Sequence, residues 1–220
     1  SKKKDQKKKD EGVVYSSDPT TRYIQQYAAI AQEEMRRYKI PASITLAQGL
    51  LESQLGQGVL AKKSNNHFGI KCKREWKGKK VYHDDDAPGE CFRAYEDPKE
   101  SYRDHSLFLA ERERYASLFR LKKTDYKAWA KGLKKAGYAT DPAYADKLIG
   151  LIERLSLWKY DNPKVSPNFS VRDRDIHIVQ KGDTLYRLSK RYKISVENLK
   201  KINGLTSSEI QIGQYIRLKK

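Results

Sequence analysis

The sequence contains no apolar run of about 18 residues, the length that a membrane-spanning helix needs, so a transmembrane segment is excluded. Cysteine is scarce, and the two cysteines lack the CxxC spacing of a zinc knuckle. Negative charge is also in deficit, because 28 acidic residues face 46 Lys and Arg and leave a formal net charge of +18. Such a surface attracts polyanions, whether nucleic acid, anionic lipid or an anionic cell wall.

The basic residues are spread along the whole chain of 220 residues rather than gathered in one arm. Nucleic-acid-binding domains usually concentrate their charge on one face, so this distribution argues against a nucleic-acid partner. Residues 1–21 are rich in lysine and lack periodic apolar residues, which predicts a flexible basic segment. A stretch of Pro, Ser, Asn and Lys predicts a linker over 161–173, between a first domain over 22–160 and a second over 174–220.

Three Asp-Pro pairs mark helix starts in the first domain, because Asp is a favourable N-cap and Pro suits the first helical position. They are Asp18-Pro19, Asp97-Pro98 and Asp141-Pro142, the last opening a helix that we expect to reach Trp158. Apolar residues three or four positions apart also predict helices over 41–55 and 124–136. Short strand-like segments separated by turns follow a different pattern, at 68–71, 79–82 and 91–95.

The first domain is therefore expected to have an α+β fold, mainly helical with a small β-sheet lobe. The second domain begins and ends with a strand-like segment, and Thr184 and Ser195 can cap two helices between them, which predicts the order βααβ. Cys72 and Cys91 lie at the ends of two predicted strands of the lobe. In an oxidising compartment they can form a disulfide worth about 3 kcal/mol, the alternative being two buried free thiols.

Glu52 is the one acidic residue of the segment 41–53 and lies about one turn before two glycines that end the predicted helix. A carboxyl group there faces the negative end of the helix dipole, and neighbouring leucines remove water from it. Both effects favour the protonated form near neutral pH, which is what cleavage of a glycosidic bond requires of its general acid. The alternative is an ordinary surface glutamate at a helix end.

A second carboxylate, Glu90, follows the acidic run 84–86 in the predicted sheet lobe. A helix acid that faces a sheet carboxylate is the two-carboxylate arrangement of glycoside hydrolases. The acidic run could instead hold calcium, but it lacks the ordered spacing of a calcium loop, so we expect no metal ion and no cofactor. Aromatic side chains suit the apolar faces of sugars, and Tyr95 and Tyr144 are candidates for substrate binding, although many tyrosines will instead line the edge of the core.

Four segments in the expected order resemble glycoside hydrolase family 73, the bacterial endo-β-N-acetylglucosaminidases of the flagellar-muramidase and autolysin type: 41–53, 66–71, 92–95 and 137–142. The resemblance covers about residues 22–160 and implies a lysozyme-like fold that hydrolyses the GlcNAc-β-1,4-MurNAc bond of peptidoglycan. By position, Glu52 matches the family's general acid, Glu90 its second carboxylate and Tyr138 its active-site tyrosine. Asn66 and Phe68 match the cleft motif that follows the catalytic helix.

Residues 174–219 resemble a LysM module through the segments 179–185, 203–205 and 212–214. LysM modules bind GlcNAc-containing glycans in a shallow groove between the loop before the first helix and the loop after the second. The resemblance places six residues at this groove: Gly182, Asp183, Thr184, Leu185, Ile210 and Gln211. The alternative is a small module for protein contacts.

Together these features predict a monomeric, exported peptidoglycan hydrolase of the bacterial periplasm, cell envelope or exterior, whose partner is the glycan strand. After Glu52 protonates the leaving oxygen, either Glu90 activates a water or the substrate's 2-acetamido carbonyl attacks, with Tyr138 nearby to orient it. The alternatives are a muramidase or lytic transglycosylase on the same scaffold, a binding-only adhesin, and a nucleic-acid binder.

Overall fold

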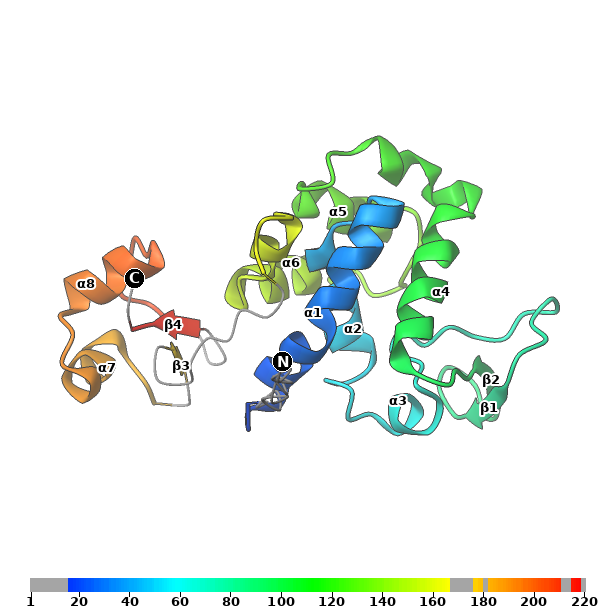
Figure 1. Cartoon of the computed structure of the whole chain (residues 1–220), viewed down its shortest axis with the longest axis horizontal. Coiled ribbons are helices and arrows are strands. Elements are labelled where there is room, and N and C mark those ends of the chain that lie inside the picture. Colours follow the sequence, from blue (N-terminus) through cyan, green and yellow to red (C-terminus); the bar gives the residue numbers. More distant parts are fainter. Residues whose placement is uncertain (1–15, 167–175, 180–181, 211–214, 219–220) are drawn as a thin grey trace, which may run out of the picture.

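The computed structural model describes residues 16–166, 176–179, 182–210 and 215–218. These residues form a larger, mainly helical body that carries one β-hairpin, and a smaller body with two helices and two strands (Figure 1). The helices of the larger body are α1 (Pro19–Tyr38), α2 (Ala42–Glu52), α3 (Val59–Ser64), α4 (Pro98–Ala110), α5 (Tyr126–Lys135) and α6 (Tyr144–Arg154), with the 3-10 helices η1 (Glu113–Arg120) and η2 (Leu157–Asp161). No described helix is long and apolar enough to cross a membrane.

The predicted N-caps of α1 and α4 are confirmed, because both aspartates accept hydrogen bonds from the first helical turn. Asp18 accepts one from the Thr21 backbone N–H, and Asp97 accepts from Lys99 and Glu100. The prediction of one continuous helix from Asp141-Pro142 to Trp158 is wrong at both ends: α6 begins at Tyr144 with Ala143 as its N-cap and ends at Arg154, and Ser156 takes a left-handed conformation with φ of 53°. This residue redirects the chain into η2. Helices α3 and η1 were not predicted.

Helix α2 lies in the core of the larger body. Residues 42–50 are all buried, and the helix packs against α1, α5, α6 and η2. Its N-cap, Pro41, has no side chain that can accept a hydrogen bond. The carboxylate of Asp161 in η2 serves as the acceptor instead. The Asp161 carboxylate accepts from the Ser43 backbone N–H at 2.8 Å and from Ser43 Oγ at 2.7 Å. The start of α2 is therefore fixed by a residue from the far end of the domain.

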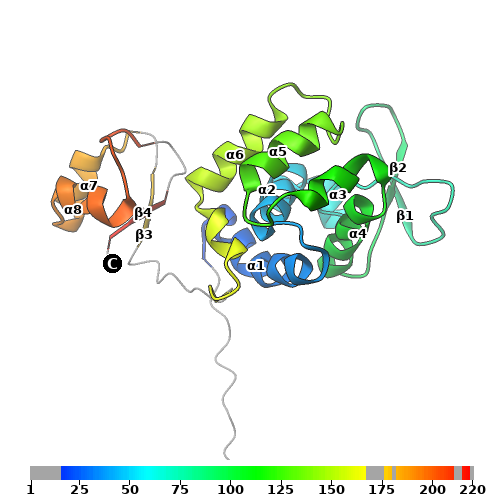
Figure 2. The same cartoon turned by 90° about the horizontal axis from the view of Figure 1, so that it is seen from above.

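The hairpin consists of antiparallel β1 (Lys80–His83) and β2 (Glu90–Arg93), with Val81 paired to Phe92. Both views place it beside α3 and α4, at the end of the body opposite α6 (Figures 1 and 2). The predicted strand at 68–71 is wrong, since only Lys71 forms a bridge to β2. The Asn66 side chain instead takes up the backbone groups of this segment: it accepts from the N–H groups of Phe68 and Ile70 and donates to the Ile70 carbonyl.

The smaller body has the predicted order of elements: β3 (Ile176–Ile178), α7 (Leu185–Tyr192), α8 (Val196–Asn203) and β4 (Tyr215–Arg217). The two strands pair antiparallel. Thr184 and Ser195 cap the two helices through their hydroxyls, as predicted. A separate small core of buried aliphatic residues stabilises this unit: Val179, Leu185, Leu188, Leu199, Ile216 and Leu218.

Candidate functional site

Glu52 is the last residue of α2 and remains accessible to solvent. Its Oε1 accepts a hydrogen bond from Tyr144 Oη at 3.3 Å. The protein around the carboxyl displaces water and raises its pKa, the Tyr144 hydrogen bond lowers it, and the negative charge of Asp85 raises it further, with a net upward shift. An accessible carboxyl with a raised pKa suits the role of a general acid.

The turn after Glu52 is strained. Gln54, Leu55 and Gly56 are all left-handed, with φ of 50°, 61° and 72°, a conformation that costs about 1–2 kcal/mol for a residue with a side chain. Ser53 holds the turn, because its Oγ donates to the Gly49 carbonyl and accepts from the Gly56 N–H at 2.7 Å. The turn ends α2 at Glu52 and leaves the carboxyl at the edge of the buried helix.

Two tyrosines lie beside this carboxyl. The left-handed Gly137, with φ of 75°, closes α5, and the Tyr138 N–H returns to the Leu133 carbonyl at 3.0 Å in a Schellman turn. The Tyr138 ring stacks on that of Tyr144, with centroids 5.7 Å apart and planes at 24°. Burial, Tyr144 and the charge of Glu52 all raise the pKa of Tyr138, so both hydroxyls stay protonated beside the acid.

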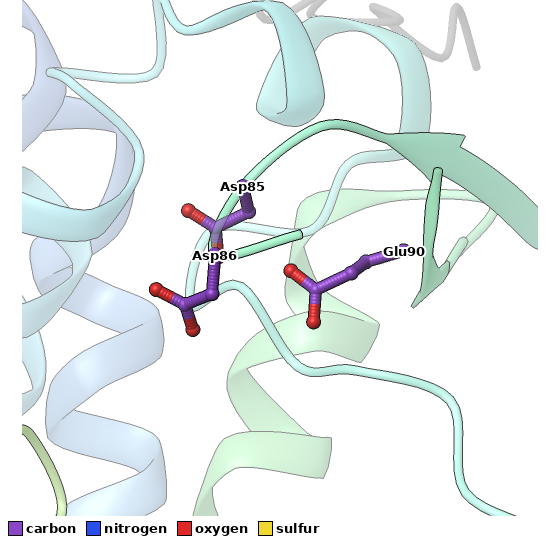
Figure 3. A group of neighbouring side chains, drawn as sticks. All are labelled: Asp85, Asp86 and Glu90. Carbon is purple, nitrogen blue, oxygen red and sulfur yellow. The ribbon is translucent and has the colours of Figure 1, made fainter. Parts of the chain in front are cut away.

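The hairpin carries the second carboxylate in a different environment. Glu90 points toward the loop that bears Asp85 and Asp86 (Figure 3). Lys71 Nζ lies 2.8 Å from Glu90 Oε1, 2.9 Å from Asp86 Oδ2 and 3.6 Å from Asp85 Oδ2. The hydrogen bond from Lys71 lowers the pKa of Glu90, so this carboxylate stays ionised.

Oxygen atoms of Asp85, Asp86 and Glu90 lie within 4.8 Å of one another, a spacing that could hold a cation. The Lys71 ammonium already lies against all three carboxylates and offsets part of their charge. The acidic cluster therefore gives no independent indication of a metal ion. Behind it, Cys72 and Cys91 are joined by a disulfide that ties the segment before the hairpin to β2.

The predicted cleft residues Asn66 and Phe68 are buried, at 1% and 4% exposure. The Asn66 amide is fully used on backbone groups, including the Arg93 carbonyl at 2.9 Å. The Phe68 ring stacks on His105, with centroids 4.1 Å apart. Their placement corrects the expectation of direct substrate contact, because both side chains support the loop after α3 from inside.

Tyr95 also departs from its expected role in substrate binding. Its hydroxyl donates to Asp104 of α4, and its ring lines a hollow of about 410 Å³ that includes Trp76 but not Glu52. Tyr144 is 3% exposed, so it reaches the site only through its hydroxyl on Glu52. Of the four predicted substrate-binding residues, Tyr144 alone touches the candidate acid.

The loop before α7 and the loop after α8 line one hollow that includes Asp183, Thr184 and Ile210, and residues 150, 153 and 154 of α6 in the larger body line it as well. Leu185 is 1% exposed and belongs to the core, so it supports this surface from below. Asp183 Oδ2 lies 2.6 Å from His177 Nε2. Gly182 has φ of 89° and accepts a hydrogen bond from Arg187 through its carbonyl. Gln211 lies outside the described residues.

Sequence reasoning missed three polar residues around the site. Gln48 and His105 are fully buried behind Tyr144, and Lys71 lies against the hairpin carboxylates. A signal for Gln48 was available, since it is a polar residue four positions before Glu52 in a mainly apolar helix. The pairing of Lys71 with Glu90 could not be predicted from the sequence, because no local pattern links two residues 19 positions apart.

Two family models match the chain. The model described as mannosyl-glycoprotein endo-beta-N-acetylglucosaminidase matches residues 28–157. The LysM domain model matches residues 177–219.

The chain is similar to the exo-glucosaminidase LytG of Bacillus subtilis, with 35% identity over 71% of this chain and 61% of that protein. It is 31% identical to the autolysin of Enterococcus faecalis, over 90% of this chain and 30% of that protein. It thus spans less than two thirds of the length of either relative. The crystal structure of a peptidoglycan hydrolase from Sphingomonas sp. A1 superposes with a TM-score of 0.56 at 30% identity, covering 66% of this chain and 96% of that one.

Proposed function

Because the chain belongs to the glucosaminidase family, glycoside hydrolase family 73, we propose that it hydrolyses peptidoglycan at the GlcNAc-β-1,4-MurNAc bond. The observation that carries this proposal is the state of Glu52. Its carboxyl is accessible at the end of a buried helix, has a raised pKa and accepts a hydrogen bond from Tyr144. Glu52 is the general acid that protonates the leaving oxygen while positive charge develops at the anomeric carbon.

Two routes complete the reaction, and each has a residue to support it. In the first, Glu90 accepts a proton from the attacking water, a role that suits a carboxylate kept ionised by Lys71. In the second, the substrate's own 2-acetamido carbonyl attacks and Tyr138 orients it. The Glu90→Gln variant separates the routes. Severe loss of turnover with an intact fold supports the first, and near-normal turnover supports the second.

The smaller body acts as the wall-binding unit in this proposal. The match to the LysM model supports binding of GlcNAc-containing strands, and Asp183 and Thr184 line a hollow that α6 also borders. The net charge of +18 concentrates the protein on anionic wall polymers, and two linked binding units gain avidity through effective concentration. We assign residues 22–160, extended through the Asp161 cap of α2, to the hydrolase domain and residues 174–220 to the binding domain, acting together as a monomer at the bacterial cell envelope or outside the cell.

The test is mass spectrometry of purified peptidoglycan digested by the wild type and by Glu52→Gln. New reducing-end GlcNAc that depends on Glu52 supports the assignment, and fragments released from the interior of strands support endo-cleavage. New reducing-end MurNAc would instead identify a muramidase, and anhydro-MurNAc ends a lytic transglycosylase. Equal digestion by Glu52→Gln would show that the acid lies elsewhere, and wall binding without digestion would indicate an adhesin.

A further inference from the structure

A row of hydrogen bonds runs through the core to the back of Glu52 and joins three helices. His105 Nε2 of α4 lies 3.0 Å from Gln48 Oε1 of α2. Gln48 Nε2 donates to Tyr144 Oη of α6 at 2.9 Å, and that hydroxyl donates to Glu52 Oε1 at 3.3 Å. Gln48 and His105 are 0% exposed and Tyr144 is 3% exposed, so water does not compete for the bonds among these three side chains. The proposed function assigns no role to Gln48 or His105.

The chemistry of the amide sets the direction of this row. An amide oxygen only accepts, so His105 must carry its hydrogen on Nε2, and burial keeps the ring neutral by lowering its pKa to about 3. The amide nitrogen only donates, so it occupies an acceptor lone pair of Tyr144 Oη. The single hydroxyl hydrogen of Tyr144 is then left for Glu52.

The reverse direction is disfavoured. With the amide turned over, its oxygen would accept the Tyr144 hydrogen, and His105 would have to carry its own hydrogen on Nδ1. That atom is buried and has no hydrogen-bond partner among the described residues. A buried N–H without an acceptor carries the full cost of its desolvation, about 1–3 kcal/mol. The observed direction leaves only an unused lone pair there.

We propose that Gln48, anchored by His105, is a positioning residue that directs the Tyr144 hydroxyl hydrogen onto Glu52 Oε1 and so reserves Oε2 for the proton delivered to the substrate. The inference rests on the proposed function of Glu52 as the acid. When Glu52 gives up its proton it becomes a carboxylate, and a hydroxyl donor bonds a carboxylate more strongly than a neutral acid. The row therefore stabilises Glu52 as the leaving oxygen takes the proton.

The same bond sets the pH at which Glu52 loses its proton. The groups that face Glu52 are Tyr144 from α6, Tyr138 from the turn after α5, and Asp85 from the hairpin loop. Asp85 and the removal of water favour the protonated form, whereas the Tyr144 donor favours the ionised form. Loss of that donor must raise the pKa of Glu52 and move the alkaline limb of the pH–rate profile to higher pH.

The experiment compares Gln48→Glu, Gln48→Met and Tyr144→Phe with the wild type, in turnover on purified peptidoglycan across pH. A glutamate at position 48 that accepts from both His105 and Tyr144 diverts the Tyr144 hydrogen from Glu52, and when ionised its negative charge raises the pKa of Glu52 in the same direction. We expect Gln48→Glu and Tyr144→Phe to lower kcat about tenfold, leave KM within about twofold, and move the alkaline limb up by about one pH unit. Gln48→Met carries no charge and frees the hydroxyl to rotate, so a smaller shift in the same direction is expected.

The double variant Gln48→Met/Tyr144→Phe is the decisive control, because both changes act on the same Tyr144–Glu52 bond and neither adds a charge. The alkaline limb of its pH–rate profile should lie close to that of Tyr144→Phe alone, since the effects of substitutions at coupled residues do not add. Full additivity, or an unchanged limb in both Gln48 variants with reduced thermal stability alone, would overturn the proposal. A ¹³C NMR titration of Glu52 gives the same answer without turnover. A raised pKa of Glu52 in both Gln48 variants supports the role of the Gln48 hydrogen bonds whether or not the wild type cleaves cell walls. If the wild type cleaves none, only the proposed function fails.

Discussion

The two carboxylates of the candidate site differ in everything except their chemical group. Glu52 ends a buried helix, has a neutral hydroxyl as its hydrogen-bond partner, and has a raised pKa. Glu90 lies on a hairpin at the surface, has an ammonium group as its partner, and has a lowered pKa. The fold thus raises the proton affinity of one carboxyl and keeps the other ionised, through the choice of neighbour rather than of residue type.

The largest expected effect comes from removing the proton donor on the helix side. Glu52→Gln keeps the size and the acceptor oxygen but has no transferable proton, so turnover should fall about 10²–10⁴-fold. Release of reducing ends from purified peptidoglycan measures this, with wall binding by sedimentation as the control for folding. If Glu52→Gln retained more than a tenth of wild-type turnover, the two carboxylates would have to exchange roles.

The stability of the hairpin depends on the disulfide between Cys72 and Cys91. Cys72→Ser/Cys91→Ser opens the bridge, whose ends are 19 positions apart, and should lower the free energy of unfolding by about 3 kcal/mol in the chain-entropy model. Urea denaturation measures the change, and hydrogen exchange locates it. Amides of the hairpin should lose more protection than amides of α2. Equal losses in both would show that the disulfide does not stabilise the hairpin selectively.

A change in the strained turn after Glu52 should have a smaller effect than either of these substitutions. Ser53→Ala removes two hydrogen bonds, to the Gly49 carbonyl and from the Gly56 N–H, and should lower the free energy of unfolding by about 1–2 kcal/mol. Turnover should fall with it, because the turn positions the acid. Ser53→Thr keeps the hydroxyl and is the matched control. Thermal unfolding and turnover are measured together, and a Thr variant as weak as the Ala variant would point to steric rather than hydrogen-bonding control.

The smallest expected effect is a shift in pH dependence. Lys71→Met removes the ammonium from the acidic cluster, so the pKa of Glu90 rises toward and above its ordinary value. A depressed carboxyl pKa stabilises the folded state above the unfolded-state pKa and loses this effect as pH falls through the folded-state pKa. In the variant both the acid limb of turnover and acid unfolding should therefore move to higher pH. Lys79→Met, which breaks the exposed pair with Glu96 on the same hairpin, should leave both unchanged.

Local signals in the sequence were sufficient for much of the fold. The caps Asp18, Asp97, Thr184 and Ser195 each bond to a residue within three positions, and all four are found as predicted. The same locality placed Glu52 at the end of its helix. The predicted removal of water from this carboxyl is also found, because burial is the first cause of its raised pKa.

Signals that depend on distant residues could not be read. The Ser43–Asp161 contact, the Lys71–Glu90 pair and the bonds of Gln48 join parts of the chain that only the tertiary fold brings together. Asn66 shows the same limit in another form. Its residue type matched a cleft motif, but its amide is used on the backbone of its own loop, and no local pattern distinguishes these two uses.

The capping of α2 by Asp161 also determines where the hydrolase domain can be cut. Asp161 lies 118 positions after Ser43, beyond both the end of the family match at 157 and the domain boundary predicted at 160. A fragment trimmed at either point would keep every residue that surrounds Glu52 yet leave the helix that carries it uncapped. Gln32 of α1 similarly donates to the carbonyls of Tyr160 and Val165. The segment that reads as the beginning of a linker is thus the closing turn of the hydrolase, and excised versions should extend through it.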